Sequence, residues 1–177
     1  MTTLTITTPA STLVVPVGAA GSGKSTLLNQ VATALGDSGF RFGNDDVRRT
    51  VCEGKFVMDA SPKVALAAIN MVATRLAHGL PAALDCTHHS EKTRADALAL
   101  AAEAGVRAVA LLCTAPLDVI LARNAARSAA LRVPSFVVTS MYENIHALTP
   151  QDLLDEGFDA VHVFEENVTE LVIEFVS

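Results

Sequence analysis

Short apolar runs along the chain alternate with longer stretches in which apolar positions recur at helical spacing. Residues 13–17 form the first such run, and residues 24–35 follow it with the spacing of a helix. The same reasoning predicts strands at 40–43, 80–84, 106–113 and 160–164, and helices at 61–79, 91–104, 117–131 and 135–148. This alternation predicts an α/β fold in which a parallel sheet is covered by helices on both faces.

Local signals mark the ends of several predicted elements. Ser90 is suited to cap the helix at 91–104, which Gly105 ends. Pro134 separates the alanine-rich helix at 117–131 from the helix that follows. Residues 44–49 open with Asn-Asp-Asp and predict a short helical or loop stretch directly after the second strand. The continuous apolar run 106–113 predicts a central strand buried on both faces.

The size of the chain, 177 residues and 18.5 kDa, fits one α/β domain, which we place at residues 12–177. Residues 1–11 are rich in threonine and lack the basic start and apolar run of a secretory signal, so we expect a flexible N-terminal tail. The apolar runs are too short to span a membrane, and we expect no membrane association.

The cysteines and the net charge narrow the classes of function. Cys52, Cys86 and Cys113 are odd in number, far apart and lack a C-x-x-C pair, which argues against a disulfide framework or a zinc site and favours a reducing cytoplasm. The net charge of -6 argues against broad, sequence-independent binding of nucleic acid, though not against a short local contact. Nothing in the sequence indicates an obligate protein partner.

A glycine loop follows the first predicted strand and precedes the first predicted helix, and residues 18–25 read G-A-A-G-S-G-K-S. This order is typical of a P-loop, which turns backbone N–H groups toward the phosphates of a nucleoside triphosphate such as ATP. In such a loop the lysine reaches the β and γ phosphates and the serine hydroxyl binds Mg²⁺. The alternative, a glycine-rich turn with an incidental lysine, does not explain the strand and helix on either side. The predicted nucleotide-binding residues are Gly18, Gly21, Ser22, Gly23, Lys24, Ser25 and Thr26, with Ser25 as the Mg²⁺ ligand.

Two carboxylates follow predicted strands directly. Asp45 comes after the second strand and Asp85 ends the third, so in an open parallel sheet both lie at the same edge as the P-loop. A kinase needs a carboxylate near the acceptor hydroxyl to orient it and to take its proton. The simpler alternatives are a helix N-cap for Asp45 and a strand-end turn for Asp85.

Arg123 and Arg127 are four residues apart on a predicted helix, with alanines between them. Such a pair suits a helical lid, at about 117–134, that stabilises charge on a transferring phosphoryl group, although a solvated basic face is the simpler alternative. His88 and His89, in the loop after Asp85, are best explained as a solvated pair.

Four of these motifs together resemble the polynucleotide 5′-hydroxyl kinases typified by bacteriophage and bacterial end-healing enzymes. The matching blocks are, in chain order, G-S-G-K-S-T at 21–26, N-D-D-V-R at 44–48, A-A-L-D-C-T at 82–87 and R-N-A-A-R at 123–127, the last followed by V-P at 133–134 and M-Y at 141–142. The second block is similar to the family's D-D-Y-R element, with Val47 in place of the aromatic residue. The D-x-D-G-T phosphatase block found in fused repair enzymes is missing from the sequence.

The resemblance implies a three-layer P-loop NTPase fold and a role for each matching residue. Asp45 would be the general base on the 5′-hydroxyl of a DNA or RNA end, and Arg48 would bind the acceptor's 3′ phosphate. Arg123 and Arg127 would be lid arginines on the donor phosphates, and Asp85 an essential second carboxylate. Related P-loop kinases phosphorylate small alcohols such as nucleosides, sugars or antibiotics, and a nucleotide-binding ATPase without an acceptor is a third alternative.

Overall fold

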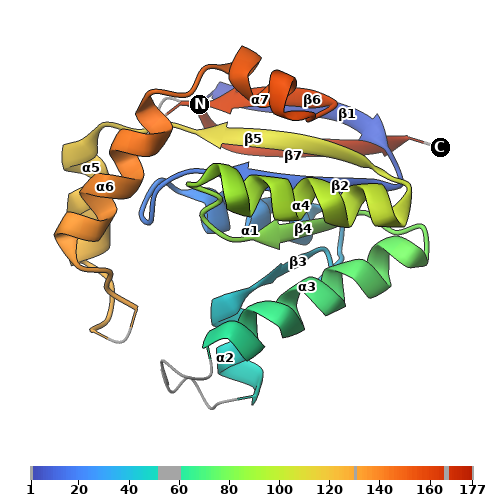
Figure 1. The fold of residues 1–177 in the computed structure, drawn as a ribbon, viewed down its shortest axis with the longest axis horizontal. Coiled ribbons are helices and arrows are strands. Elements are labelled where there is room, and N and C mark those ends of the chain that lie inside the picture. Colours follow the sequence, from blue (N-terminus) through green and yellow to red (C-terminus); the bar gives the residue numbers. More distant parts are fainter. Residues whose placement is uncertain (1, 52–60, 130, 166–167, 177) are drawn as a thin grey trace.

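A computed structural model describes residues 2–51, 61–129, 131–165 and 168–176 of the protein (Figure 1). Its centre is a five-stranded sheet in the order β3-β4-β2-β5-β6, in which every neighbouring pair is parallel. The strands are β2 (Thr12–Val17), β3 (Arg41–Gly43), β4 (Ala82–Asp85), β5 (Arg107–Cys113) and β6 (Ala160–Phe164). The predicted parallel sheet is therefore confirmed.

Helices cover both faces of this sheet, as the sequence predicts (Figure 1). They are α1 (Lys24–Ala34), α2 (Asn44–Val51), α3 (Ser61–Ala77), α4 (Glu91–Ala104), α5 (Leu117–Ala125), α6 (Ser135–His146) and α7 (Pro150–Glu156). Side chains of β2 alternate between the two faces, so Leu13 and Val15 pack in the core with α3 and α4, whereas Val14 packs on the side of α1. All six residues of β2 are buried, because the strand lies in the middle of the sheet and feeds the glycine loop.

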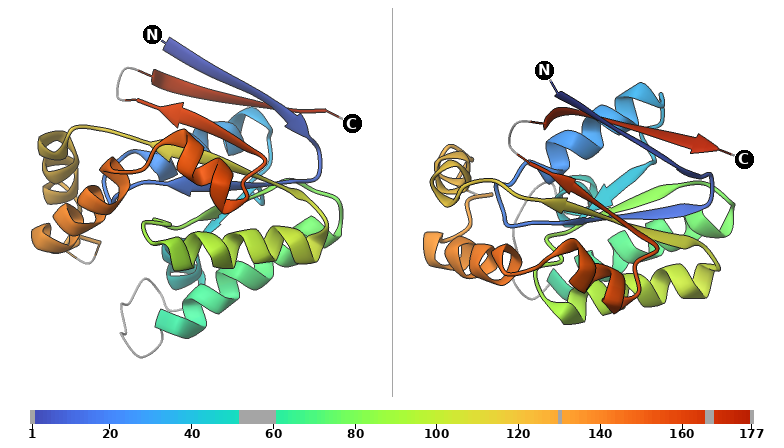
Figure 2. Two further views of the ribbon diagram at one scale, coloured as in Figure 1. Left: turned by 45° about the horizontal axis from the view of Figure 1, so that its top comes forward. Right: turned by 90° about the horizontal axis from the view of Figure 1, so that it is seen from above.

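The expectation of a flexible tail at residues 1–11 is wrong. β1 (Thr2–Pro9) pairs in parallel with β7 (Val168–Val176) to form a separate two-stranded sheet, whose strands run side by side in Figure 2. Ile6 is 2% exposed and lies in one core cluster with Leu171 and α1 residues. Threonine is β-branched and suits a strand, but its partner strand is at the other end of the chain, where local composition cannot reveal it.

The lid helix is shorter than predicted, because α5 ends at Ala125 and not near 131. The buried amide of Asn124 donates to the Val133 carbonyl (2.7 Å) and accepts from the Val133 N–H (3.1 Å). This pair of bonds turns the chain back onto the end of α5. Arg127 therefore lies after the helix that carries Arg123, and not on the same helical face.

Helix α4 follows its prediction closely. Ser90 caps it by accepting from the Thr93 N–H, and Gly105 ends it in the left-handed conformation with φ 66. Helix α7 and the Thr149 cap before it were not predicted. In the described part of the chain no helix is long and apolar enough to cross a membrane.

Candidate active site

A cleft of about 1430 Å³ opens at the carboxyl edge of the sheet, between the glycine loop, α2, the end of β4 and the loop after α5. All the predicted site residues line it except Gly18. Six of the thirteen basic residues of this acidic chain also line the cleft: Lys24, Arg41, Arg48, Arg123, Arg127 and Arg132. Four acidic residues, Asp45, Asp85, Asp96 and Glu165, line it too, so the lining is net positive in a chain whose net charge is negative, which favours phosphate groups.

The glycine loop has the geometry of a phosphate cradle. Gly21 has φ 99, and a Cβ there would lie 2.7 Å from the Ile120 carbonyl oxygen, so both the backbone conformation and the close approach of α5 require glycine. Among the described residues no side chain caps the first turn of α1, and the turn carries no acidic residue. The start of this helix therefore suits an anionic ligand. Ser25 and Thr26 follow directly and face the cleft.

Lys24, the first residue of α1, is buried against the loop, with its Nζ donating to the carbonyl oxygens of Gly18 (2.8 Å) and Ala19 (2.7 Å). Burial lowers the pKa of Lys24. The negative charge of Asp85 opposes this effect and the positive charge of Arg127 adds to it, so these three groups belong to one electrostatic site. A phosphate would offer the ammonium group a stronger partner than two carbonyls. Gly18 has a structural role, because its N–H donates to the Thr87 carbonyl (3.0 Å).

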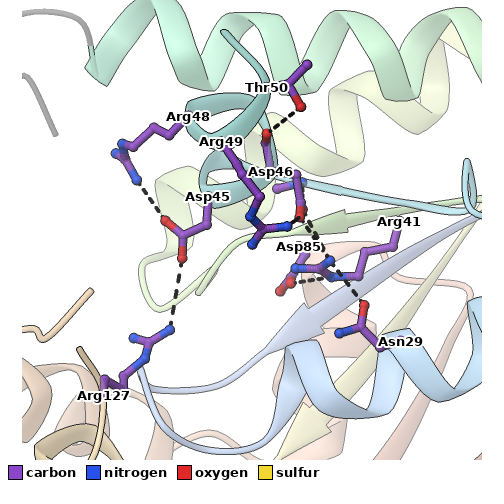
Figure 3. Close-up of polar contacts among 10 residues, drawn as sticks. Asn29, Arg41, Asp45, Asp46, Arg48, Arg49, Thr50, Asp85 and Arg127 are labelled. Carbon is purple, nitrogen blue, oxygen red and sulfur yellow. Dashed lines mark hydrogen bonds and ion pairs between the residues drawn. The ribbon is translucent and has the colours of Figure 1, made fainter. Parts of the chain in front are cut away.

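Asp45 lies between two arginines from different parts of the chain (Figure 3). Its Oδ1 accepts a hydrogen bond from Nη1 of Arg48 (2.9 Å), one turn further along α2, and its Oδ2 lies 4.0 Å from Nη2 of Arg127. The Asp45 side chain is 38% exposed, so a ligand in the cleft can reach it. The structure thus brings together the predicted carboxylate of α2 and the predicted lid arginine.

Asp85 is held by an arginine that the sequence did not indicate. Nε of Arg41 donates to Oδ2 of Asp85 at 2.7 Å, and Nη1 donates to Oδ1 of Asp46 (3.2 Å) and of Asn29 (3.1 Å) (Figure 3). The Asp85 side chain is 5% exposed, so this ion pair neutralises a buried carboxylate. The sequence did hold one signal for this ion pair: Arg41 is a charged residue within the short strand β3, and a charged side chain in such a place needs a partner.

The loop after Asp85 corrects the prediction for His88. His88 is 2% exposed, has φ 45, and its Nδ1 lies 2.9 Å from the Pro16 carbonyl oxygen, which can only accept, so Nδ1 carries the proton. Burial lowers the pKa of His88 to about 4 and keeps the ring neutral. The ring is therefore a fixed part of the interior and not half of a solvated pair.

Cys86 and Cys113, the two cysteines near the cleft, keep their thiols protonated at neutral pH. Burial raises the pKa of the Cys86 thiol to about 11 and that of Cys113 to about 12. Both thiols are free. Cys52 lies outside the described residues. The described part of the chain contains no cluster of three or more His, Cys, Asp or Glu side chains that could hold a metal ion.

The sheet order, the loop and the helix after it define a P-loop protein of kinase-like fold. Residues 13–149 match the family model described as AAA domain (AAA_33), and the chain belongs to this family. No curated protein matches the chain.

Several solved structures share the fold at low identity. A chain in the structure of the Pnkp1/Rnl/Hen1 RNA repair complex has a TM-score of 0.64 and 18% identity, and the match covers 78% of this chain and 44% of that one. A gluconokinase from Sinorhizobium meliloti has a TM-score of 0.54 and 20% identity, covering 90% of this chain and 85% of that one. The APS kinase of Mycobacterium tuberculosis in complex with AMPPNP and APS has a TM-score of 0.54 and 22% identity, covering 83% and 99%. At these identities the likeness shows the fold and not the reaction.

Proposed function

We propose that the protein is an ATP- and Mg²⁺-dependent kinase that transfers the γ-phosphate to the 5′-hydroxyl of a polynucleotide end. The observation that carries this proposal is the position of Asp45 between Arg48 and Arg127. Arg127, on one side of the carboxylate, can bind the donor phosphate, and Arg48, on the other side, can bind a phosphate of the acceptor. Asp45 would then lie between donor and acceptor, where a general base is needed.

The donor half of the site consists of the glycine loop, Lys24 and the lid. In the proposed complex Lys24 leaves its carbonyl partners for the β and γ phosphates, and the N-terminus of α1 faces the same anion. Mg²⁺ would neutralise charge on the phosphates, held by the Ser25 hydroxyl and by phosphate oxygens. Arg123 and Arg127 line the same cleft and would contact these phosphates.

The acceptor half consists of Asp45 and Arg48 on α2. Arg48 would exchange part of its contact with Asp45 for the 3′ phosphate of the terminal nucleotide, which places the 5′-hydroxyl at the carboxylate. The acceptor oxygen then bonds to the γ-phosphorus while the bond to the β–γ bridging oxygen breaks. ADP leaves, and the hydroxyl proton passes to Asp45. Arg127 stabilises the charge that develops on the transferred group.

A small alcohol is the second candidate acceptor, because the cleft also has an apolar portion. Ala65 and Ile69 of α3 and Ala97 and Leu100 of α4 contribute to its lining. Apolar walls suit the body of a sugar, nucleoside or antibiotic and offer nothing to a phosphate backbone. The gluconokinase and the APS kinase share the fold, which keeps this alternative in the test.

The test is transfer of label from [γ-³²P]ATP to a 5′-hydroxyl oligonucleotide, with the 5′-phosphorylated oligonucleotide as control and a panel of small alcohols in parallel. We expect label on the first oligonucleotide and none on the second. Raising the salt should weaken binding of an oligonucleotide but hardly affect a neutral alcohol. Label on a small alcohol alone would overturn the polynucleotide proposal, and the kinase would be of the second kind.

Arg48 has a matched control on its own helix. Arg49 is the next residue, carries the same charge, and its side chain is 73% exposed and outside the cleft. Arg48→Gln should raise the KM for the oligonucleotide by about tenfold or more, the loss expected for a charge-assisted contact, whereas Arg49→Gln should change it by less than about twofold. Equal effects of the two substitutions would remove Arg48 from the acceptor site.

A further inference from the structure

The hydrogen-bond ladder between β4 and β2, the strand that leads into the glycine loop, stops before either strand ends. The pairing of β2 with β4 joins Leu13 to Ala82 and Val14 to Ala83. Backbone groups of alternate residues in a strand point to the same neighbour, so Pro16 and Gly18 face the side of β4, as Val14 does. Pro16 has no N–H to offer there, so the ladder stops at Val14 although β4 runs on to Asp85, and the Leu84 carbonyl accepts instead from the Cys86 N–H (2.9 Å).

The loop after β4 supplies the missing partners. Nδ1 of His88 donates to the Pro16 carbonyl (2.9 Å), and the Thr87 carbonyl accepts from the Gly18 N–H (3.0 Å). The imidazole thus acts as a substitute strand partner at the last turn before the phosphate cradle. The same loop begins at Asp85, so these two bonds join the glycine loop to the carboxylate.

The loop after β4 is also held from the side of helices α4 and α7. The His88 carbonyl accepts from Nη1 of Arg94 (3.3 Å), a side chain of α4 that is 4% exposed. Arg94 also binds Glu156 of α7 in a bidentate ion pair, with Nε to Oε2 at 2.6 Å and Nη2 to Oε1 at 2.5 Å. His88 is therefore fixed between the glycine loop on one side and two helices on the other, in a left-handed conformation that few residues adopt.

We infer that His88 is a positioning residue: its side chain fixes the glycine loop relative to Asp85 by way of the Pro16 carbonyl. The inference rests on the proposed phosphoryl transfer but not on the identity of the acceptor. The N–H groups that bind phosphate move with the loop, so a displaced loop still binds ATP. The γ-phosphate it holds then sits wrongly relative to the two carboxylates, and turnover suffers more than affinity.

Two substitutions separate this role from general destabilisation. Asparagine carries an amide nitrogen on Cγ, as Nδ1 is carried in histidine, and tolerates the left-handed conformation, so His88→Asn keeps the donor. His88→Ala removes it. We expect kcat to fall about 100-fold in His88→Ala, with the Kd for ATP within about threefold of wild type, and His88→Asn to recover most of the loss. His78→Ala, at an exposed position just after α3 and outside the cleft, is the control and should keep the wild-type kcat.

The amide of Gly18 reports on the same bond network without any turnover. We expect its hydrogen exchange to be at least about tenfold faster in His88→Ala than in wild type, and unchanged in His78→Ala and His88→Asn. If exchange at Gly18 does not change, or if His88→Asn is as impaired as His88→Ala, the inference is overturned. If the exchange result holds but no acceptor is labelled, the proposed function fails, whereas the structural part of the inference, that His88 fixes the glycine loop, stands.

Discussion

Asp45 and Arg127 face each other across the cleft, with Oδ2 of the carboxylate 4.0 Å from Nη2 of the guanidinium. Asp45 belongs to α2 and Arg127 to the loop after α5, so the contact joins two segments that are far apart in the sequence. Arg48 holds the other carboxylate oxygen. A ligand that enters between α2 and the loop after α5 must therefore displace the contacts of Asp45 with Arg48 and Arg127. Phosphate groups can do so, because they can replace the carboxylate as partners of both arginines.

Replacing the proposed base tests whether the protein has an acceptor at all. Asp45→Asn should lower kcat for phosphoryl transfer by about 10²- to 10⁴-fold, because the hydroxyl loses the group that orients it and takes its proton. The Kd for ATP, measured by calorimetry, should stay nearly unchanged. Glu103→Gln, on the exposed face of α4, removes the same charge as a control. Equal turnover in Asp45→Asn and wild type would favour an ATPase without an acceptor.

Replacing the lid arginine tests its role in the transition state. Arg127→Gln should lower kcat by about 10³-fold or more and change the affinity for ATP much less, because the charge that Arg127 stabilises develops during transfer. Arg107→Gln, at the start of β5 and outside the cleft, serves as control in the same kinetic assay. A loss of ATP affinity with kcat unchanged would mean that Arg127 contacts the donor equally in the ground state and in the transition state.

Arg41 should contribute to stability as well as to the site. Arg41→Ala leaves the nearly buried carboxylate of Asp85 without its ion pair, and we expect the free energy of unfolding in urea to fall by roughly 3 kcal/mol. Arg41→Lys should recover part of this loss. Lys92→Ala breaks an ion pair between exposed side chains of α4 and should cost less than about 1 kcal/mol. Similar losses for both alanine variants would show that the ion pair of Arg41 with Asp85 stabilises the fold no more than a surface pair does.

The buried histidine predicts a pH dependence of stability. The pKa of His88 falls from 6.5 to about 4 on folding, mainly because the ring is buried, so below pH 6.5 the unfolded chain binds a proton that the folded chain does not. The free energy of unfolding therefore keeps its full value above pH 6.5 and falls by up to about 3 kcal/mol as the pH is lowered toward 4.

Urea titrations of wild type and His88→Asn from pH 7.5 to 4.5 measure this contribution. Burial also lowers the pKa of His89 and His162, but both remain in the variant, so the difference between the two curves isolates His88. A constant difference over this pH range would show that His88 takes up its proton equally in both states.

The sequence predicts the elements whose signals are local. The runs at β2 and β5, the cap of α4 and the glycine loop all follow from neighbouring residues, and the edge shared by Asp45 and Asp85 follows from the direction of the strands. The end of α5 does not, because it depends on the amide of Asn124 reaching Val133. A helix pattern along the chain carries no information on such a tertiary bond.

The same limit explains what was missed in the site. Arg41 and His88 act through partners that are distant in sequence, Asp85 and Pro16. The sequence alone could not predict these pairings, because they depend on which strands are neighbours in the sheet. Pro16, an unusual residue in a buried strand, was a visible signal, and the ring of His88 is its explanation.

The pairing of β1 with β7 has a consequence for how the protein is made. β1 emerges from the ribosome before every other described element, but its partner β7 follows all of them. Ile6 and the side of α1 that β7 covers must stay exposed to water or to a chaperone while the rest of the domain is synthesised. The active-site half of the molecule can fold early, and this last parallel pairing, with its long loop closure, is expected to set the pace of folding.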